Sequence, residues 1–167
     1  MAETAPLEFI IQDEQQLTHF SEIISPFIKT PSIIYLNGNL GTGKTTFTQK
    51  LLYTFNYHGK VKSPTYTIVE EYTLKQAILY HFDLYRISDP EELEFIGIRD
   101  YVYKQSICIF EWASKGKGII PKANLIINFE YLPEGRKLIL NVDGHQYNNE
   151  FIVELHQLWK RFLQHSV

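Results

Sequence analysis

The stretch Gly38-Asn39-Leu40-Gly41-Thr42-Gly43-Lys44-Thr45-Thr46 matches the pattern G-x-x-x-x-G-K-[ST] at every fixed position. It follows the β-branched and aromatic run 33–36, which predicts a buried strand. Phe47, Leu51 and Leu52 come after it at the spacing of one helical face. This order of strand, glycine loop and helix is the context in which the pattern predicts a phosphate-binding loop.

The chemistry expected of this loop follows from its residue types. Its glycines permit backbone angles that side chains disfavour, so the loop N–H groups can converge on an anion at the positive end of the next helix. Lys44 supplies a cation for β- and γ-phosphate oxygens, and the Thr45 hydroxyl suits Mg²⁺. The residues expected to bind the nucleotide here are Asn39, Leu40, Gly41, Thr42, Gly43, Lys44, Thr45 and Thr46.

Length and composition favour one globular domain over residues 1–167. The formal net charge is -3, so no strong electrostatic attraction to nucleic acid is expected. The single cysteine, Cys108, excludes an internal disulfide and a cysteine-rich zinc site, and its apolar surroundings predict burial. Neither a secretory signal pattern nor an apolar run of membrane-spanning length is present, which predicts a cytoplasmic protein without a membrane partner.

The rest of the chain predicts further strands and helices around the loop. Strands are expected at 7–11, 68–72, 76–85, 106–112, 125–131 and 137–142. Helices are expected after Asp13, after Pro90 and after Asn148 or Asn149. Short turns join two of the strand pairs as hairpins. We therefore expect a three-layer α/β domain of the P-loop NTPase-like class, with a mixed central sheet that accommodates both hairpins.

Two acids lie where strands are expected to end, and nucleotide hydrolysis needs an acid for the metal and a group that positions water. Glu111 follows the apolar run 107–110, which resembles the second NTPase motif, although that motif usually ends in aspartate. Asp83 shares a strand face with His81. The alternatives are that Glu111 is only the polar end of a strand, and that Asp83 only forms a structural pair with Arg86.

Four segments beside the loop resemble the bacterial TsaE (YjeE) family, and together they are far more specific than the loop alone. The segments are Val61-Lys62-Ser63-Pro64-Thr65-Tyr66-Thr67, His81-Phe82-Asp83-Leu84-Tyr85-Arg86, Glu91-Glu92-Leu93-Glu94-Phe95-Ile96-Gly97-Ile98-Arg99-Asp100-Tyr101 and Phe110-Glu111-Trp112. The resemblance is strongest from Ile33 to Trp112 and weak after Tyr131. This chain departs from the family at Ala113, where proline is usual.

The resemblance implies a Mg²⁺-dependent ATPase required for making N6-threonylcarbamoyladenosine in tRNAs that read codons beginning with A. Family members act with the TsaB and TsaD proteins. TsaD transfers the threonylcarbamoyl group, and the ATPase lets the complex turn over repeatedly. ATP and Mg²⁺ are the implied cofactors, and tRNA is reached indirectly through the complex.

The resemblance also implies roles for single residues. The expected catalytic set is Lys44, Asp83 and Glu111, with Thr45 and Glu111 holding Mg²⁺, directly or through water. Asp83 is expected to orient or deprotonate the attacking water, directly or through neighbours. No arginine finger is obvious within the chain, so slow turnover of the isolated protein is expected.

Further nucleotide contacts are implied by the family pattern at positions away from the loop. Glu14 lies near the start of the first expected helix, and Gly135 and Arg136 lie in the late hairpin. Ser63-Pro64-Thr65 matches a second mobile loop of the family. Glu14, Gly135 and Arg136 extend the expected nucleotide site beyond the glycine loop.

Three other functions fit parts of the sequence. A small-molecule kinase closes an arginine-bearing lid over the phosphates, but Arg86, Arg99, Arg136 and Arg161 do not cluster. A GTPase switch normally selects guanine with N-K-x-D, which is absent, as is D-x-x-G at a strand end. A non-catalytic binding module, in which ATP only props a docking surface, fits the same residues as an ATPase. Partner-stimulated phosphate release would separate these two.

Overall fold

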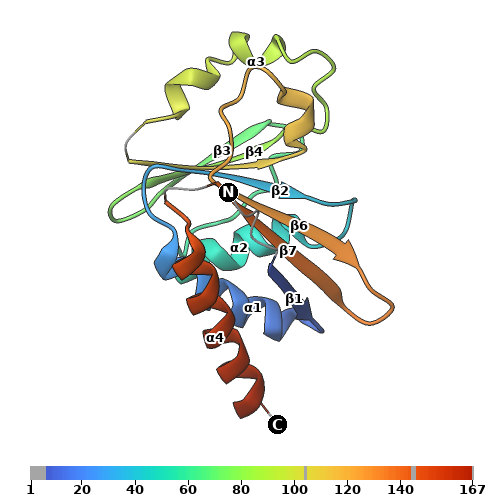
Figure 1. Ribbon diagram of the computed structural model, residues 1–167. Coiled ribbons are helices and arrows are strands. Elements are labelled where there is room, and N and C mark those ends of the chain that lie inside the picture. Colours follow the sequence, from blue (N-terminus) through green and yellow to red (C-terminus); the bar gives the residue numbers. More distant parts are fainter. Residues whose placement is uncertain (1–6, 104, 144–145, 167) are drawn as a thin grey trace.

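A computed structural model describes the protein over residues 7–103, 105–143 and 146–166. Its centre is a seven-stranded sheet in the order β1-β7-β6-β2-β5-β4-β3 (Figure 1). The strands are β1 (Leu7–Ile11), β2 (Ser32–Asn37), β3 (Val69–Thr73), β4 (Ile78–Asp83), β5 (Ser106–Glu111), β6 (Leu125–Tyr131) and β7 (Arg136–Val142). The α-helices are α1 (Glu14–Ile24), α2 (Lys44–Thr54), α3 (Glu92–Phe95) and α4 (Asn149–His165). The 3-10 helices are η1 (Ser25–Phe27), η2 (Ile98–Tyr101) and η3 (Ala113–Gly116).

The sheet is mixed, as the sequence predicts. Strand β2 pairs in parallel with both β5 and β6, and β4 pairs in parallel with β5. The β3–β4, β6–β7 and β1–β7 pairs are antiparallel, and the first two are the expected hairpins. The carboxyl ends of β2, β4, β5 and β6 consequently lie at one edge of the sheet, where open α/β sheets bind their ligands.

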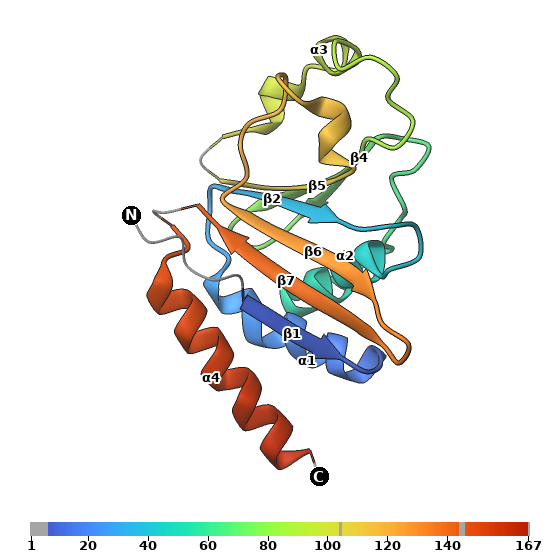
Figure 2. The same cartoon turned by 45° about the vertical axis from the view of Figure 1, so that its right-hand side comes forward.

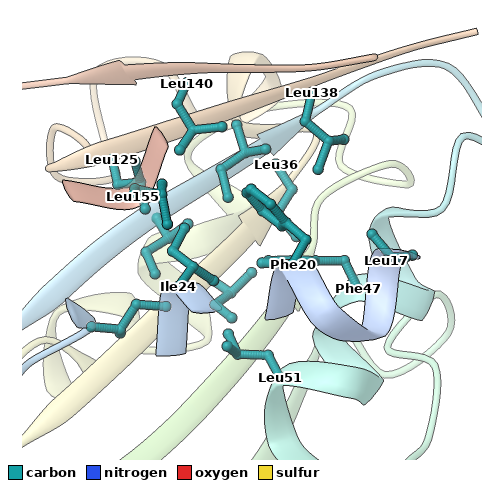
Figure 3. Packing of buried hydrophobic residues seen from close by; sticks show 14 of the residues in the cluster. Leu17, Phe20, Ile24, Leu36, Phe47, Leu51, Leu125, Leu138, Leu140 and Leu155 are labelled. Carbon is teal, nitrogen blue, oxygen red and sulfur yellow. The ribbon is translucent and has the colours of Figure 1, made fainter. Parts of the chain in front are cut away.

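Strand side chains alternate between two faces, and each face has its own hydrophobic core. Helices α1, α2 and α4 cover one face (Figures 1 and 2). Phe20, Phe47 and Leu155 meet in that core (Figure 3), and the ring centroids of Phe20 and Phe47 are 6.1 Å apart. Short helices and loops, rather than long helices, cover the other face.

Local sequence signals account for the starts of helices α1 and α4. The Asp13 carboxylate accepts a hydrogen bond from the Gln16 N–H at 2.8 Å, and the Asn148 side chain accepts one from the Phe151 N–H at 3.1 Å. Both predicted N-caps are confirmed. No helix in the described parts of the chain is both long and apolar enough to cross a membrane.

The connections that leave β2 and β5 pass to opposite faces of the sheet. After β2 the chain forms the glycine loop and enters α2, which belongs to the core beneath α1. After β5 it enters η3, whose Ala113 is buried in the other core. Neighbouring parallel strands with diverging connections leave a crevice at their carboxyl ends. The glycine loop and Glu111 both lie at that crevice.

Candidate functional site

The glycine loop between β2 and α2 needs glycine for two separate reasons. Gly43 has φ +102, a left-handed conformation that side chains disfavour. A Cβ atom on Gly43 would also lie only 1.8 Å from Nη1 of Arg136. At Gly38, with φ +152, a Cβ atom would lie 2.7 Å from the carbonyl oxygen of Phe129. The loop therefore combines unusual backbone angles with close packing against the β6–β7 hairpin.

Two side chains of that hairpin brace the loop. Arg136 Nη1 donates a hydrogen bond to the Thr42 carbonyl oxygen, and the Tyr131 hydroxyl donates one to the Leu40 carbonyl oxygen, each at 3.0 Å. Both bonds engage carbonyl groups, so they leave the loop N–H groups free to face an anion. Arg136 was expected near the nucleotide, whereas Tyr131 was missed. Its position at the end of a predicted hairpin strand was the only signal in the sequence.

Lys44, at the start of α2, is buried at the centre of the loop, with 5% of its surface exposed. Its ammonium group donates hydrogen bonds to the carbonyl oxygens of Gly38 at 2.6 Å and Asn39 at 3.1 Å. Burial lowers the pKa of Lys44, while the negative charges of Glu111 and Asp83 act in the opposite direction. The ammonium also lies 5.0 Å from the centre of the Trp112 ring. The cation is thus held in place on the loop.

The β4–β5 register brings the predicted acids to the first turn of α2. Asp83 lies opposite Glu111 in the parallel ladder, and both side chains are buried. The Thr45 hydroxyl lies 3.2 Å from Oε2 and 3.4 Å from Oε1 of Glu111. Nε2 of His81 lies 2.7 Å from the same Oε2. The structure therefore brings together Thr45 and Glu111, the predicted metal ligands.

Asp83 is held by neighbours other than the one first considered. Its Oδ1 accepts a hydrogen bond from the Tyr85 N–H at 3.0 Å, and its Oδ2 accepts one from the Thr65 hydroxyl at 3.3 Å. The Arg86 guanidinium instead lies 4.1 Å from the centre of the Tyr66 ring. The alternative of a structural Asp83–Arg86 pair is therefore wrong. Thr65 connects the loop 63–65 with the site.

The donor set at Thr45 and Glu111 fits Mg²⁺ rather than a metal caged by protein. Within the described parts of the chain, no group of three or more His, Cys, Asp or Glu residues could hold a metal ion. Mg²⁺ needs no such group at nucleotide sites, because it keeps water and phosphate oxygens beside one or two protein oxygens. The hydroxyl of Thr45 and the carboxylate of Glu111 could supply such oxygens here.

The three positions expected outside the loop have different surroundings. Glu14 lines a cavity of about 320 Å³ together with Thr46 and Lys50, and its carboxylate is 3.9 Å from Nζ of Lys50. Arg136 contacts the loop itself. Gly135 has φ +83, and a Cβ atom there would lie 2.3 Å from the Ile11 carbonyl oxygen. Packing of the hairpin on β1 therefore explains this glycine without a ligand.

A second and larger cavity opens behind the loop on the η3 side. Its volume is about 570 Å³, within the range of small-molecule sites, and it lies at the carboxyl ends of β2 and β5. The lining includes Tyr35, Asn37, Trp112, Lys117 and Lys122. Trp112 has φ +58, a left-handed conformation that is uncommon for a bulky residue. The sequence placed Trp112 in a family motif without a role.

These features define an α/β protein with a phosphate-type glycine loop at the carboxyl ends of its parallel strands. The family model described as "Threonylcarbamoyl adenosine biosynthesis protein TsaE" matches residues 11–138, which is most of the chain. The chain therefore belongs to the TsaE family, and the resemblance noted in its motifs is confirmed.

Individual relatives agree with the family assignment. A tRNA threonylcarbamoyladenosine biosynthesis protein TsaE of Haemophilus influenzae is 51% identical over 122 residues, covering 72% of this chain and 77% of that protein. One from Bacillus subtilis is 33% identical over 128 residues, covering 76% and 80%. The crystal structure of YdiB from Bacillus subtilis matches with a TM-score of 0.73 at 24% identity, covering 95% of this chain and 97% of that chain. At this identity the structural likeness shows the fold alone.

Proposed function

We propose that this protein is a Mg²⁺-dependent ATPase that supports tRNA N6-threonylcarbamoyladenosine formation by keeping a TsaB–TsaD complex in turnover. One observation carries the nucleotide chemistry: the Thr45 hydroxyl and the Glu111 carboxylate meet beside the buried Lys44 at the start of α2. Membership in the TsaE family carries the pathway. The proposal describes one cytoplasmic P-loop NTPase-like domain over residues 1–167, which meets tRNA only through its protein partners.

The loop and the first turn of α2 bind the phosphates in this proposal. The loop N–H groups face the phosphate oxygens, and Lys44 exchanges its bonds to the carbonyls of Gly38 and Asn39 for bonds to the β- and γ-phosphates. Thr45 and Glu111 hold Mg²⁺, directly or through water. The metal, when bound, neutralises charge on the β- and γ-phosphate oxygens.

Asp83 acts on the attacking water in the same scheme. Bonds from the Tyr85 N–H and the Thr65 hydroxyl fix its carboxylate on the sheet face that carries Glu111. A fixed carboxylate can orient the water or accept its proton. Because Thr65 belongs to the loop 63–65, movement of that loop would change the hydrogen bonding of Asp83. This couples the loop to hydrolysis.

A partner is expected to complete the site, because three of the four described arginines are engaged elsewhere and the fourth, Arg161, lies on α4. Arg86 stacks on Tyr66, Arg99 pairs with Glu94 at 2.9 Å, and Arg136 braces the loop. None of these three is placed as an arginine finger, which typically accelerates hydrolysis about 10³- to 10⁵-fold. Nucleotide contacts from Gly135 and Arg136 of the hairpin and from Glu14 at the start of α1 complete the proposed binding site.

The second candidate is a non-catalytic module in which bound ATP only props a docking surface. The contact between Thr65 and Asp83 fits this candidate as well as the ATPase, because it links the loop 63–65 to the phosphate site whether or not a bond is cleaved. Both candidates predict nucleotide binding. Only the ATPase predicts that phosphate release accompanies each round of partner turnover.

The test is formation of modified tRNA by a TsaB–TsaD pair under multiple turnover, with threonylcarbamoyl-adenylate supplied. The protein is added as wild type, as Lys44→Ala, or as Lys160→Ala, a control lysine on the exposed side of α4. We expect sustained turnover with wild type and Lys160→Ala, accompanied by phosphate release, and loss of both with Lys44→Ala. Sustained turnover with wild type without phosphate release would favour the non-catalytic module, whereas equal turnover with Lys44→Ala would contradict both candidates. No effect of any version would overturn the proposed function.

A further inference from the structure

His81 is a buried polar residue for which neither the expected catalytic set nor the fold provides a reason. It lies on β4 with none of its surface exposed. Strand neighbours on the same sheet face, Leu79, Ile107 and Ile109, are fully or almost fully buried apolar residues. An imidazole there loses hydration that an aliphatic side chain would not need. Its retention therefore calls for a compensating interaction.

The compensating interaction is the 2.7 Å contact between His81 Nε2 and Glu111 Oε2. In the parallel ladder His81 lies opposite Ile109, so the imidazole reaches Glu111 one step along the same face. Nδ1 is buried and has no hydrogen-bond partner in the described parts of the chain. A proton on Nδ1 would be a buried donor without an acceptor, which is costly, so the proton belongs on Nε2, where it is donated to Glu111.

Because of this bond, the two oxygens of the Glu111 carboxylate have different hydrogen-bond partners. Oε2 is held by His81 and also lies 3.2 Å from the Thr45 hydroxyl. Among the described residues, Oε1 has only the longer contact of 3.4 Å to Thr45. A carboxylate with one oxygen held by a rigid, buried donor cannot rotate freely. The oxygen that remains, Oε1, lies beside the other expected metal ligand.

We propose that His81 is a positioning residue that holds Glu111 by Oε2, which would leave Oε1 available, with the Thr45 hydroxyl, to bind Mg²⁺. The inference rests on the proposed function, in which Thr45 and Glu111 hold the metal. His81 does not touch the nucleotide or the metal. Residues that orient a metal ligand through a hydrogen bond typically change metal affinity about 10- to 100-fold when they are replaced.

The test separates metal binding from nucleotide binding. ADP affinity is measured by calorimetry, first in EDTA and then across a Mg²⁺ titration, for wild type, His81→Leu, His81→Gln and His81→Asn. Leucine removes the N–H donor. Glutamine keeps an N–H donor on a side chain one methylene longer than that of asparagine, which is too short for its N–H group to reach Glu111. Thermal unfolding of each variant reports on the fold.

We expect His81→Leu to keep Mg²⁺-free ADP affinity within about 2-fold of wild type and to raise the Mg²⁺ concentration at half-saturation about 10- to 100-fold. His81→Gln is expected to lie closer to wild type than His81→Asn. An unchanged Mg²⁺ half-saturation in His81→Leu overturns the inference, as does an equal loss of ADP affinity with and without Mg²⁺. If His81→Leu does not fold, equal Mg²⁺ values for the Gln and Asn variants overturn it.

The wild-type titration distinguishes failure of the inference from failure of the proposed function. If wild-type ADP affinity does not depend on Mg²⁺, the proposed Mg²⁺ site at Thr45 and Glu111 is refuted, and so is the positioning role of His81. If wild type depends on Mg²⁺ and the His81 variants behave like wild type, only the positioning role is wrong.

Discussion

The hydroxyl group of Tyr131 and the guanidinium of Arg136 act on the glycine loop through its carbonyl oxygens. Each donates one hydrogen bond, to Leu40 and Thr42 respectively, at 3.0 Å. Neither bond occupies an N–H group that an anion would need. The loop can therefore be held in its binding conformation before a nucleotide arrives. Such preorganisation lowers the entropy cost of binding.

Tyr131→Phe should weaken nucleotide binding with little change in fold stability. The substitution removes the hydroxyl that donates to Leu40, and Tyr131 is 58% exposed, so the core is not affected. A hydrogen bond of this kind is worth about 0.5–1.5 kcal/mol, which corresponds to a loss of about 2- to 12-fold in ADP affinity. Calorimetry and thermal unfolding would measure the two quantities. Unchanged ADP affinity would show that the brace is unimportant.

At the scale of elements, the β6–β7 hairpin joins the loop to the edge of the sheet. One of its strands, β7, pairs with β1, and its turn packs Gly135 against the Ile11 carbonyl oxygen at the end of β1. The same hairpin carries the two side chains that brace the loop. The position of β1 therefore influences the phosphate site through the hairpin.

Gly135→Ala should destabilise the protein more than Gly118→Ala. Both glycines have left-handed backbone angles, with φ +83 and +88, so both substitutions cost about 1–2 kcal/mol in backbone conformation. A Cβ atom at Gly135 would additionally lie 2.3 Å from the Ile11 carbonyl oxygen, whereas nothing lies within 4 Å of one at Gly118. Urea unfolding of the two variants measures the difference. Equal destabilisation would mean that the hairpin moves away from β1 freely.

At the scale of the whole molecule, α4 closes the core beside β1 although it lies outside the residues matched by the family model. Trp159 of α4 packs edge-on against Phe9 of β1 and Phe20 of α1, with ring centroids 6.1 and 6.0 Å apart. Figure 2 shows α4 along the outside of the molecule on the β1 side, away from the junction of β2 and α2. Helix α4 thus supports the fold rather than the site.

Trp159→Ala should lower the free energy of unfolding by about 3–5 kcal/mol, because it removes a large side chain that is 3% exposed. ADP affinity of the folded variant should stay within about 2-fold of wild type, because α4 does not contribute to the described site residues. Leu163→Ala, at a position 39% exposed on the same helix, is the matched control and should change stability by less than about 1 kcal/mol. Circular dichroism follows unfolding in urea. A large loss of ADP affinity in folded Trp159→Ala would contradict the conclusion that α4 supports the fold and not the site.

Alkaline pH provides a second test of how the C-terminal region is attached to the sheet. Burial raises the pKa of Tyr147 to about 12, while hydrogen bonding to Ser32 acts the other way. The folded protein then keeps this proton where the unfolded chain loses it, so stability should fall as pH rises from about 10 to 12. Tyr147→Phe should remove that part of the fall. Identical pH profiles of urea unfolding for both proteins would contradict this role of Tyr147.

Local residue patterns were sufficient to predict much of this protein. The glycine loop, both N-caps and the two hairpins depend on interactions between residues close in sequence, and the hairpins in turn require a mixed sheet. The burial of Cys108 also follows from its apolar run. Expected strand ends indicated Glu111 and Asp83 as candidate acids, and the family motifs added their roles together with Glu14, Gly135 and Arg136. Each of these features can be recognised from residue types at a characteristic spacing along the chain.

Contacts between distant residues depended on strand order and register, which local patterns do not specify. His81 meets Glu111 across 30 residues, Tyr131 meets Leu40 across 91, and Arg136 meets Thr42 across 94. Each requires a particular pair of elements to lie side by side with one face inward. The sequence by itself determined a phosphate-type loop and its candidate acids. Tertiary structure alone decided which buried imidazole holds Glu111 and which hairpin braces the loop, because only folding brings these groups within hydrogen-bond distance.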